Sequence, residues 1–285
     1  MAKIKVAELF YSIQGEGRYM GVPSVFLRTF GCNFTCGGFN MPKGMVSNER
    51  DLAAANIGLY KNYGNLPLVA TGCDSYASWD PRFKHLSPSL ETDEIAYEIS
   101  KILPFKHWEE EHLVITGGEP LLGWQRAYPD LLNNPAMRHL QHITFETNGT
   151  QRITVAFSKY LKEWLSQSTQ YGQREITFSV SPKLSVSGEN QEDAIRPVIV
   201  EEYQKIGPTY LKYVIATEED AEEALRATKS YQQHGFFGST YFMPVGGTES
   251  VYNLNNKAVA LLAMKHGVRY SDRLQVPLFK NEWGT

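Results

Sequence analysis

The segment that decides the fold covers residues 25–36 and reads Val-Phe-Leu-Arg-Thr-Phe-Gly-Cys-Asn-Phe-Thr-Cys. Its apolar start predicts a buried strand over 25–29, and the glycine and two cysteines fall in the loop that follows. Gly37, Gly38 and Phe39 come next. A cysteine at position 39 would complete a familiar pattern of metal-cluster ligands, but the chain has phenylalanine there.

Strands and helices alternate along the rest of the chain. Apolar runs predict six further strands, at 113–116, 143–146, 176–180, 211–216, 241–245 and 269–276. Helical patterns predict helices at 93–103 behind an N-cap at Thr92, and at 156–166, 218–233 and 255–266, the last one ending before Gly267. This order predicts an α/β fold in which right-handed helical crossovers join parallel strands into an open or partial barrel.

Glycine and polar residues follow these strands at their carboxyl ends. They are Gly31-Cys32, Gly117-Gly118-Glu119-Pro120, Thr147-Asn148-Gly149-Thr150, Ser181-Pro182-Lys183 and Pro244-Val245-Gly246-Gly247. Read alone, each is an ordinary turn or strand end. In parallel barrels, however, the carboxyl-end rim is where loops from several strands build an active site. Their shared position therefore predicts a site at that rim.

The segment 37–72 interrupts the alternation of strands and helices, and we interpret it as an insertion. It carries one predicted helix over 49–61, with Ser47 or Asn48 as its cap. Apolar residues at 53–55, 57, 59 and 60 give it a face that a free linker would lack. We expect it to pack over the rim as a cover.

Composition limits the possible functions. The 285 residues are 42% hydrophobic, enough for one barrel-sized domain or two smaller ones. A net charge of −3 with interspersed signs argues against a nucleic-acid partner. The first residues lack the apolar core of a signal peptide, and no apolar run is long enough to span a bilayer, so we expect a cytoplasmic protein without a membrane partner.

The three cysteines are the candidate metal ligands. In a reducing compartment Cys32, Cys36 and Cys73 are ligands, nucleophiles or buried apolar residues rather than disulfides. Soft thiolates select iron–sulfur clusters, zinc or copper(I). A cubane cluster usually takes four cysteines, so three would leave one iron open for reaction. Zinc held by the three cysteines and a histidine such as His85 is the non-catalytic alternative.

The opening of the chain resembles a known enzyme family. The quoted run is Glu8-Leu9-Phe10-Tyr11-Ser12-Ile13-Gln14-Gly15-Glu16-Gly17, followed by Gly21-Val22-Pro23, Phe26-Leu27-Arg28 and Gly31-Cys32-Asn33. It is similar to the start of the 7-carboxy-7-deazaguanine synthases, which are radical S-adenosylmethionine enzymes. The likeness continues through 116–120, 146–150, 181–183 and Arg273-Leu274-Gln275-Val276, and covers nearly all of the chain outside 37–72. A glycyl-radical activase would share the cysteines and Gly-Gly-Glu but would not need the 14–17 motif.

The resemblance implies a single radical S-adenosylmethionine domain over 1–285, a partial (β/α)6-type barrel with 37–72 inserted between the second and third cluster cysteines. In the family two residues separate those cysteines, and Asp-Thr follows the third; here Cys73 is followed by Asp74-Ser75. A [4Fe-4S] cluster would then cleave S-adenosylmethionine to a radical that takes hydrogen from 6-carboxy-5,6,7,8-tetrahydropterin, leading to 7-carboxy-7-deazaguanine and ammonia. Loop closure costs only about 0.6 kcal/mol per doubling of length, so the insertion is tolerable.

The resemblance also implies the ligand-binding residues and the partners. The residues that match S-adenosylmethionine contacts are Asp74, Gly117, Gly118, Glu119, Asn148, Ser181, Pro182, Lys183, Met243, Pro244, Val245 and Gly246. Those that match substrate contacts are Ile13, Gln14, Gly15, Glu16, Arg28, Thr116 and, at the C-terminus, Thr285. Ser75 would bind Mg²⁺ as the family's threonine does. A flavodoxin- or ferredoxin-type electron donor and a homodimer are the implied partners.

Overall fold

A nine-stranded sheet organises the computed structural model, which describes residues 2–285. The strand order is β11-β10-β9-β8-β5-β4-β2-β1-β3. Neighbours from β2 to β11 pair in parallel, whereas β1 pairs antiparallel with both β2 and β3. The strands are β1 Lys3–Ile13, β2 Pro23–Thr29, β3 Ser89–Glu91, β4 His112–Gly117, β5 His142–Thr147, β8 Glu175–Val180, β9 Thr209–Ile215, β10 Thr240–Pro244 and β11 Arg269–Tyr270, with a separate hairpin of β6 Ser168–Thr169 and β7 Gly172–Gln173.

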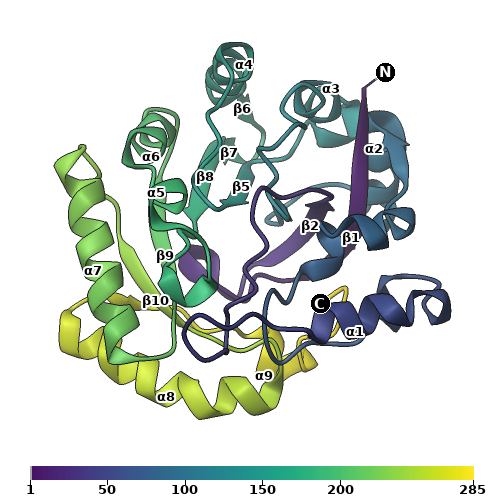
Figure 1. Cartoon of the computed structure of the whole chain (residues 1–285). Helices are drawn as coiled ribbons and strands as arrows, with labels where there is room; N and C mark the ends of the chain where they lie inside the picture. Colours follow the sequence, from purple (N-terminus) through teal and green to yellow (C-terminus); the bar gives the residue numbers. More distant parts are fainter. Residues whose placement is uncertain (1) are drawn as a thin grey trace.

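Helices cover the outer face of the curved sheet. Figure 1 shows α2, α3, α4, α6, α7 and α8 as an arc around it. The helices are α1 Glu49–Ala55, α2 Thr92–Ile102, α3 Tyr128–Leu132, α4 Val155–Leu165, α5 Gln191–Ala194, α6 Pro197–Gln204, α7 Glu218–Gln233, α8 Glu249–His266 and α9 Gln275–Phe279. Because the edge strands β3 and β11 do not pair with each other, the barrel stays open. The predicted α/β partial barrel is confirmed.

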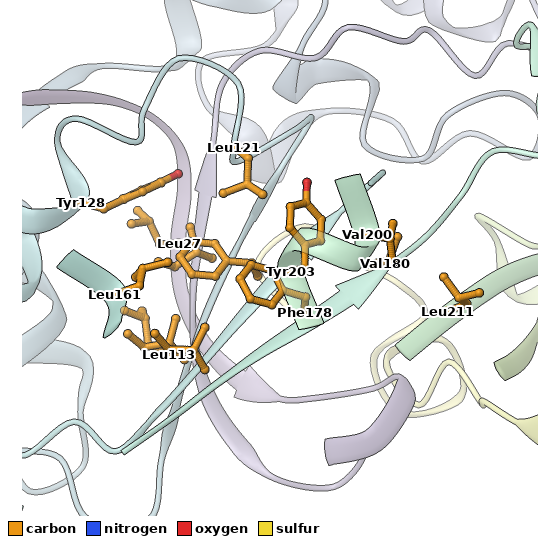
Figure 2. Close-up of a cluster of buried hydrophobic side chains, with 14 of the residues drawn as sticks. Leu27, Leu113, Leu121, Tyr128, Leu161, Phe178, Val180, Val200, Tyr203 and Leu211 are labelled. Atoms are coloured by element: carbon orange, nitrogen blue, oxygen red, sulfur yellow. The ribbon is translucent and has the colours of Figure 1, made fainter. Parts of the chain in front are cut away.

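The hydrophobic core lies between the sheet and this arc of helices. Leu113 and Ile115 of β4 are fully buried in it. Phe178 of β8 stacks on Phe145 with a ring-centroid distance of 5.6 Å and on Tyr203 of α6 at 4.7 Å, as the cluster in Figure 2 shows in part. Since side chains alternate across a strand, packing one face against the helices leaves the other face for the interior of the barrel.

The predicted strands agree with the structure except at the C-terminal end. The expected strand 269–276 pairs only at Arg269 and Tyr270. The chain then leaves the sheet, because Arg273 turns into the barrel interior to pair with Glu16 and Asp74. β1 was not predicted, since its eleven residues mix lysine and glutamate with apolar positions.

The helix predictions differ mainly at the ends. The cap of α2 is Glu91 rather than Thr92, since Glu91 forms a capping box with Glu94. α8 begins six residues before the predicted start and ends as predicted at Gly267, whose φ of 65° is left-handed. The helix expected over 49–61 ends at Ala55 and is followed by a short 3-10 turn.

None of the helices in residues 2–285 combines the length and apolar character needed to cross a membrane.

Candidate active site

A cavity of about 250 Å³ opens among the carboxyl ends of the parallel strands and brings most of the predicted site residues together. Its wall includes Ile13, Gln14, Gly15, Glu16, Arg28, Cys32, Cys36, Cys73, Asp74, Ser75, Thr116, Gly117, Gly118, Asn148, Ser181, Lys183, Met243, Val245, Gly246 and Thr285. The wall draws on both ends of the chain and, with Lys212 and Val214 of β9, on every strand of the parallel sheet from β2 to β10. The rim predicted from the sequence is therefore a real junction of loops.

Three predicted ligand contacts are not part of this wall: Glu119, Pro182 and Pro244. The carboxylate of Glu119 is completely buried. It accepts hydrogen bonds from the backbone N–H of Leu121 at 3.0 Å and Asn148 at 2.7 Å, and from the hydroxyl of Thr147 at 2.8 Å. Burial raises the pKa of Glu119 to about 7, against the effect of these donors. The Glu119 carboxylate thus joins the loops after β4 and β5.

The three cysteines meet on one side of the cavity. Cys36 is buried with Phe34 and Ala194, and Cys32, Cys73 and Phe39 pack against this small cluster. The backbone N–H of Cys36 donates to the carboxylate of Glu189 at 2.6 Å, in a turn where Cys36 has a φ of 48°. The backbone is thus held in a conformation that most residues avoid, with the Cys36 thiol on the cavity wall.

The surroundings of the thiols suit an iron–sulfur cluster. The sulfur of Cys32 accepts from the backbone N–H of Phe34 and that of Cys73 from the indole N–H of Trp79, both at 3.4 Å. Hydrogen bonds of this kind tune the potential of a bound cluster. Burial raises the pKa of Cys32 to about 12 and also raises those of Cys36 and Cys73. Binding of a cluster to these thiols would therefore release protons.

The zinc alternative finds no support in this geometry. Among residues 2–285, no three His, Cys, Asp or Glu side chains are grouped tightly enough to hold one metal ion. His85 is exposed, lies outside the cavity wall, and has its Nδ1 at 3.1 Å from the carbonyl oxygen of Arg82. A cubane cluster spreads its ligands over separate irons, so its thiols stand farther apart than those around a single zinc.

The loop after β4 packs directly against the first cysteine. A Cβ at Gly118 would lie 2.4 Å from the carbonyl oxygen of Gly31 and 2.7 Å from the Cβ of Cys32. A side chain at this position would push the two loops apart. Glycine at 118 therefore keeps the backbone of the Gly-Gly loop beside the cluster loop.

A buried network of charges forms another part of the cavity wall. Lys212 of β9 pairs with Glu16, whose other carboxylate oxygen accepts from Arg273 at 3.1 Å. Arg273 also pairs with Asp74 at 2.6 Å. Burial opposes ionisation of Glu16, but the charges of Lys212 and Arg273 outweigh it and hold its pKa at about 2. The network ties the 14–17 motif to Asp74, the residue after the third cysteine.

Arg28 lies beside the predicted magnesium ligand. Its Nε pairs with Glu8 at 2.8 Å, and its Nη1 donates to the hydroxyl of Ser75 at 3.2 Å. The Ser75 hydroxyl in turn donates to Asp74 at 3.3 Å. A guanidinium has five N–H donors, so Arg28 keeps donors for an anionic group in the cavity.

The insertion and the C-terminal tail close the cavity from outside. Phe39, Asn40, Leu68, Ala70 and Gly72 belong to the wall, as do residues 281–285. Trp283 packs edge-on against Tyr63 of the insertion at 5.6 Å and against Tyr76 at 5.7 Å. Figure 1 likewise shows the C-terminus next to α1. Within the expected apolar face, Ala53 is buried whereas Leu59 is 74% exposed, so that part of the prediction is wrong.

The sequence did not single out Lys212, Glu146 or Trp283 as site residues. Lys212 had a usable signal, because a lone lysine within the apolar strand 209–215 is unexpected in a buried parallel sheet. Arg273 was quoted only as part of the tail motif, and its role follows from the turn after β11. Trp283 carries no local signal, since its partners lie more than 200 residues away.

Three thiols beside glycine-rich strand ends, at the carboxyl end of an open parallel barrel, define an enzyme of the radical S-adenosylmethionine class. A 7-carboxy-7-deazaguanine synthase from Halobacterium salinarum is 30% identical over 98% of this chain and 91% of its own length. One from Pyrobaculum aerophilum is 24% identical over 99% of this chain and 97% of its own. The chain belongs to the 7-carboxy-7-deazaguanine synthase family.

The fold comparison agrees with this assignment. QueE from Escherichia coli has a TM-score of 0.53 to this structure at 18% identity, covering 95% of this chain and 94% of that chain. At such low identity the likeness concerns the fold. A scan against protein-family models finds no match.

Proposed function

We propose that this chain converts 6-carboxy-5,6,7,8-tetrahydropterin to 7-carboxy-7-deazaguanine and ammonia. The observation that carries the proposal is that one cavity joins Cys32, Cys36 and Cys73 to the substrate motif at 13–16 and to Arg28. The Halobacterium and Pyrobaculum relatives bear the name of this activity. A [4Fe-4S] cluster held by the three cysteines would supply the electron that splits S-adenosylmethionine and starts the radical reaction.

The chain's own residues would bind and orient the two ligands. The backbone of Gly117 and Gly118 and the polar groups of Asn148, Ser181 and Lys183 would hold the amino-acid part of S-adenosylmethionine. Lys183 donates to the hydroxyl of Ser181 at 3.2 Å and to its carbonyl oxygen at 3.0 Å, which keeps the ammonium group at the cavity wall. Glu119 acts as a positioning residue by holding the backbone of Asn148.

The pterin would lie deeper, between the 13–16 motif and Arg28. The free N–H groups of Arg28 suit the substrate carboxylate, because a guanidinium can pair with it through two parallel hydrogen bonds. Gln14 donates to Glu146 at 3.2 Å, so both amide and carboxylate are fixed for contacts with the pterin ring. Thr285 lies on the wall of the same cavity, as the resemblance implies for a substrate contact.

Mg²⁺, a protein electron donor and a homodimer complete the proposal. Ser75 would offer its hydroxyl to Mg²⁺, with the adjacent Asp74 carboxylate at 3.3 Å as the available charged oxygen. The ion would displace the present hydrogen bond from Arg28, which would free that donor for the substrate.

Anaerobic reconstitution tests the proposed function. The protein is incubated with the carboxytetrahydropterin, S-adenosylmethionine and dithionite, and the products are examined by mass spectrometry. We expect 7-carboxy-7-deazaguanine and 5'-deoxyadenosine in the parent protein. Formation of 5'-deoxyadenosine with no deazapurine would support another radical enzyme, such as a glycyl-radical activase.

A further inference from the structure

The turn that carries Cys36 is held by one carboxylate from a distant part of the chain. Glu189 lies between β8 and α5, and one oxygen of its carboxylate accepts three hydrogen bonds from this turn. The donors are the backbone N–H of Thr35 at 2.8 Å, the Thr35 hydroxyl at 3.1 Å and the backbone N–H of Cys36 at 2.6 Å. Because hydrogen bonds to an ionised acceptor are stronger than neutral ones, these bonds fix the backbone at the second cysteine.

The segment that carries this carboxylate packs against the same turn. The backbone N–H of Gly38 donates to the carbonyl oxygen of Ser187 at 2.9 Å. A Cβ at Gly38 would lie only 2.7 Å from the backbone nitrogen of Gly188, so the two segments are in close contact. Further along, Ala194 of α5 is fully buried in the small apolar cluster that contains Cys36. Residues before and after the carboxylate thus contact the cysteine turn and keep the carboxylate in place.

The turn needs this support because of its backbone conformation. Cys36 has a φ of 48°, in the left-handed region that residues with a side chain avoid. Such a conformation persists only where the surroundings hold it. Without the carboxylate, the backbone N–H groups of Thr35 and Cys36 would lose their acceptor. Glu189 therefore helps to keep the Cys36 thiol on the cavity wall.

The carboxylate also keeps its negative charge. Its three donors are neutral groups, and no lysine, arginine or histidine in residues 2–285 forms an ion pair with Glu189. Net charge and hydrogen bonds to the sulfurs set the reduction potential of an iron–sulfur cluster. A negative charge beside the cluster opposes the addition of an electron. In addition, the two N–H groups that donate to Glu189 are withheld from the cluster sulfurs, where they would favour the reduced form.

We propose that Glu189 is a positioning residue that holds the Cys36 turn and keeps the reduction potential of the bound [4Fe-4S] cluster low. The inference deepens the proposed function and rests on it, since reductive cleavage of S-adenosylmethionine needs a strongly reducing cluster. When the cluster is reduced, one electron passes to it from the reductant and no atom is transferred. A unit charge at about 10 Å shifts such an equilibrium by roughly tenfold at an effective dielectric constant of about 20.

Two substitutions separate the hydrogen bonds of Glu189 from its charge. Glu189→Gln keeps a carbonyl oxygen as the acceptor but removes the charge, whereas Glu189→Ala removes both. Glu110→Gln is the matched control, because it removes an exposed carboxylate from the loop between α2 and β4, at the opposite end of the barrel. Neither residue lines the cavity, so these changes leave the predicted ligand contacts intact.

The readouts are measured on the anaerobically reconstituted proteins without S-adenosylmethionine or substrate. A redox titration followed by the electron paramagnetic resonance signal of the reduced cluster gives the midpoint potential. Iron and sulfide analysis gives the cluster content. Circular dichroism of the metal-free proteins shows whether each variant is folded.

We expect Glu189→Gln to bind a full cluster that is more easily reduced. At the midpoint potential of the parent, its ratio of reduced to oxidised cluster should be about tenfold higher, equivalent to about 59 mV for a one-electron couple. Glu189→Ala should fold but hold substoichiometric iron and sulfide, and Glu110→Gln should match the parent in both measurements.

Two kinds of result would overturn the role of Glu189. One is a Glu189→Gln protein that lacks a cluster or keeps the parent's potential, and the other is a full cluster in Glu189→Ala. Failure of the proposed function would appear differently, as a parent protein that binds the cluster and shows the expected shift on substitution but forms no deazapurine with dithionite.

Discussion

The buried pair of Lys212 and Glu16 gives the sharpest prediction about stability. Their side chains are only 5% and 14% exposed, and Lys212→Met would leave one carboxylate oxygen of Glu16 without its partner. Removing one member of a buried pair costs about 3–5 kcal/mol. Arg273 and Gln275 still donate to the other oxygen at 3.1 and 2.8 Å, so we expect the lower end of this range.

A loss of about 3 kcal/mol should lower the thermal midpoint by about 5 °C in a chain of this size. The assay is circular dichroism of the metal-free protein at pH 7. The pKa of Glu16 is lowered from its ordinary value of 4.5 to about 2, so its ion pairs stabilise the fold fully at pH values above 4.5. This stabilisation is lost as the pH falls from 4.5 toward 2, and pH 7 therefore measures the full effect. The effect of Lys212→Met should therefore shrink in acid.

A surface pair and a double variant complete the test. Lys205 pairs with Glu201 at 2.7 Å but is 62% exposed, so Lys205→Met should cost less than about 1 kcal/mol. Combining Glu16→Gln with Lys212→Met should be less harmful than the sum of the single changes, by about 1 kcal/mol or more. The reasoning is refuted if Lys212→Met is as mild as Lys205→Met, or if the two changes add without coupling.

Three further predictions concern single residues of the site. Ser75→Ala should abolish the magnesium dependence of turnover while leaving 5'-deoxyadenosine formation measurable; unchanged magnesium dependence would exclude Ser75 as the ligand. Glu119→Gln should lower stability by about 1–3 kcal/mol, because an amide NH₂ would face a buried donor. Since the pKa of Glu119 is raised from 4.5 to about 7, the free energy of unfolding of the parent protein should fall as the pH rises from 4.5 to 7. Thermal melts of Glu119→Gln should not show this pH dependence. Trp283→Ala should raise the KM for the pterin more than it lowers kcat, because the tail loses its aromatic contacts with Tyr63 and Tyr76; equal changes in kinetics for Trp283→Ala and the exposed Phe237→Ala would count against a role of the tail.

Local patterns were sufficient for the barrel strands and for the rim. Strands such as 113–116 and 176–180 are short apolar runs that are followed by glycine or proline. Such runs can be predicted without knowledge of the rest of the chain. The glycine and polar residues that follow these strands likewise predicted that Gly118, Asn148 and Lys183 lie at one edge of the sheet. These residues meet in the cavity because parallel strands bring their carboxyl ends together.

Features that depend on distant partners could not be predicted in this way. β1 is a strand because it pairs on both sides, with β2 and with β3, although its composition is mixed. The hydrogen bonds that the Glu119 carboxylate accepts from Thr147 and Asn148 join two loops that the sequence alone does not place together. The turn that carries Arg273 inward depends on Glu16, which lies at the other end of the sequence.

The central claim is that the cluster ligands are Cys32, Cys36 and Cys73, so that the pattern interrupted at Phe39 resumes after the insertion. The measurement that tests it most directly is the iron and sulfide content of anaerobically reconstituted Cys73→Ala, with Phe39→Ala as the matched control. We expect Cys73→Ala to fold, to hold substoichiometric iron and sulfide, and to form no 5'-deoxyadenosine, whereas Phe39→Ala should keep a full cluster. A Cys73→Ala protein that binds a complete [4Fe-4S] cluster and cleaves S-adenosylmethionine at the parent rate would contradict the claim.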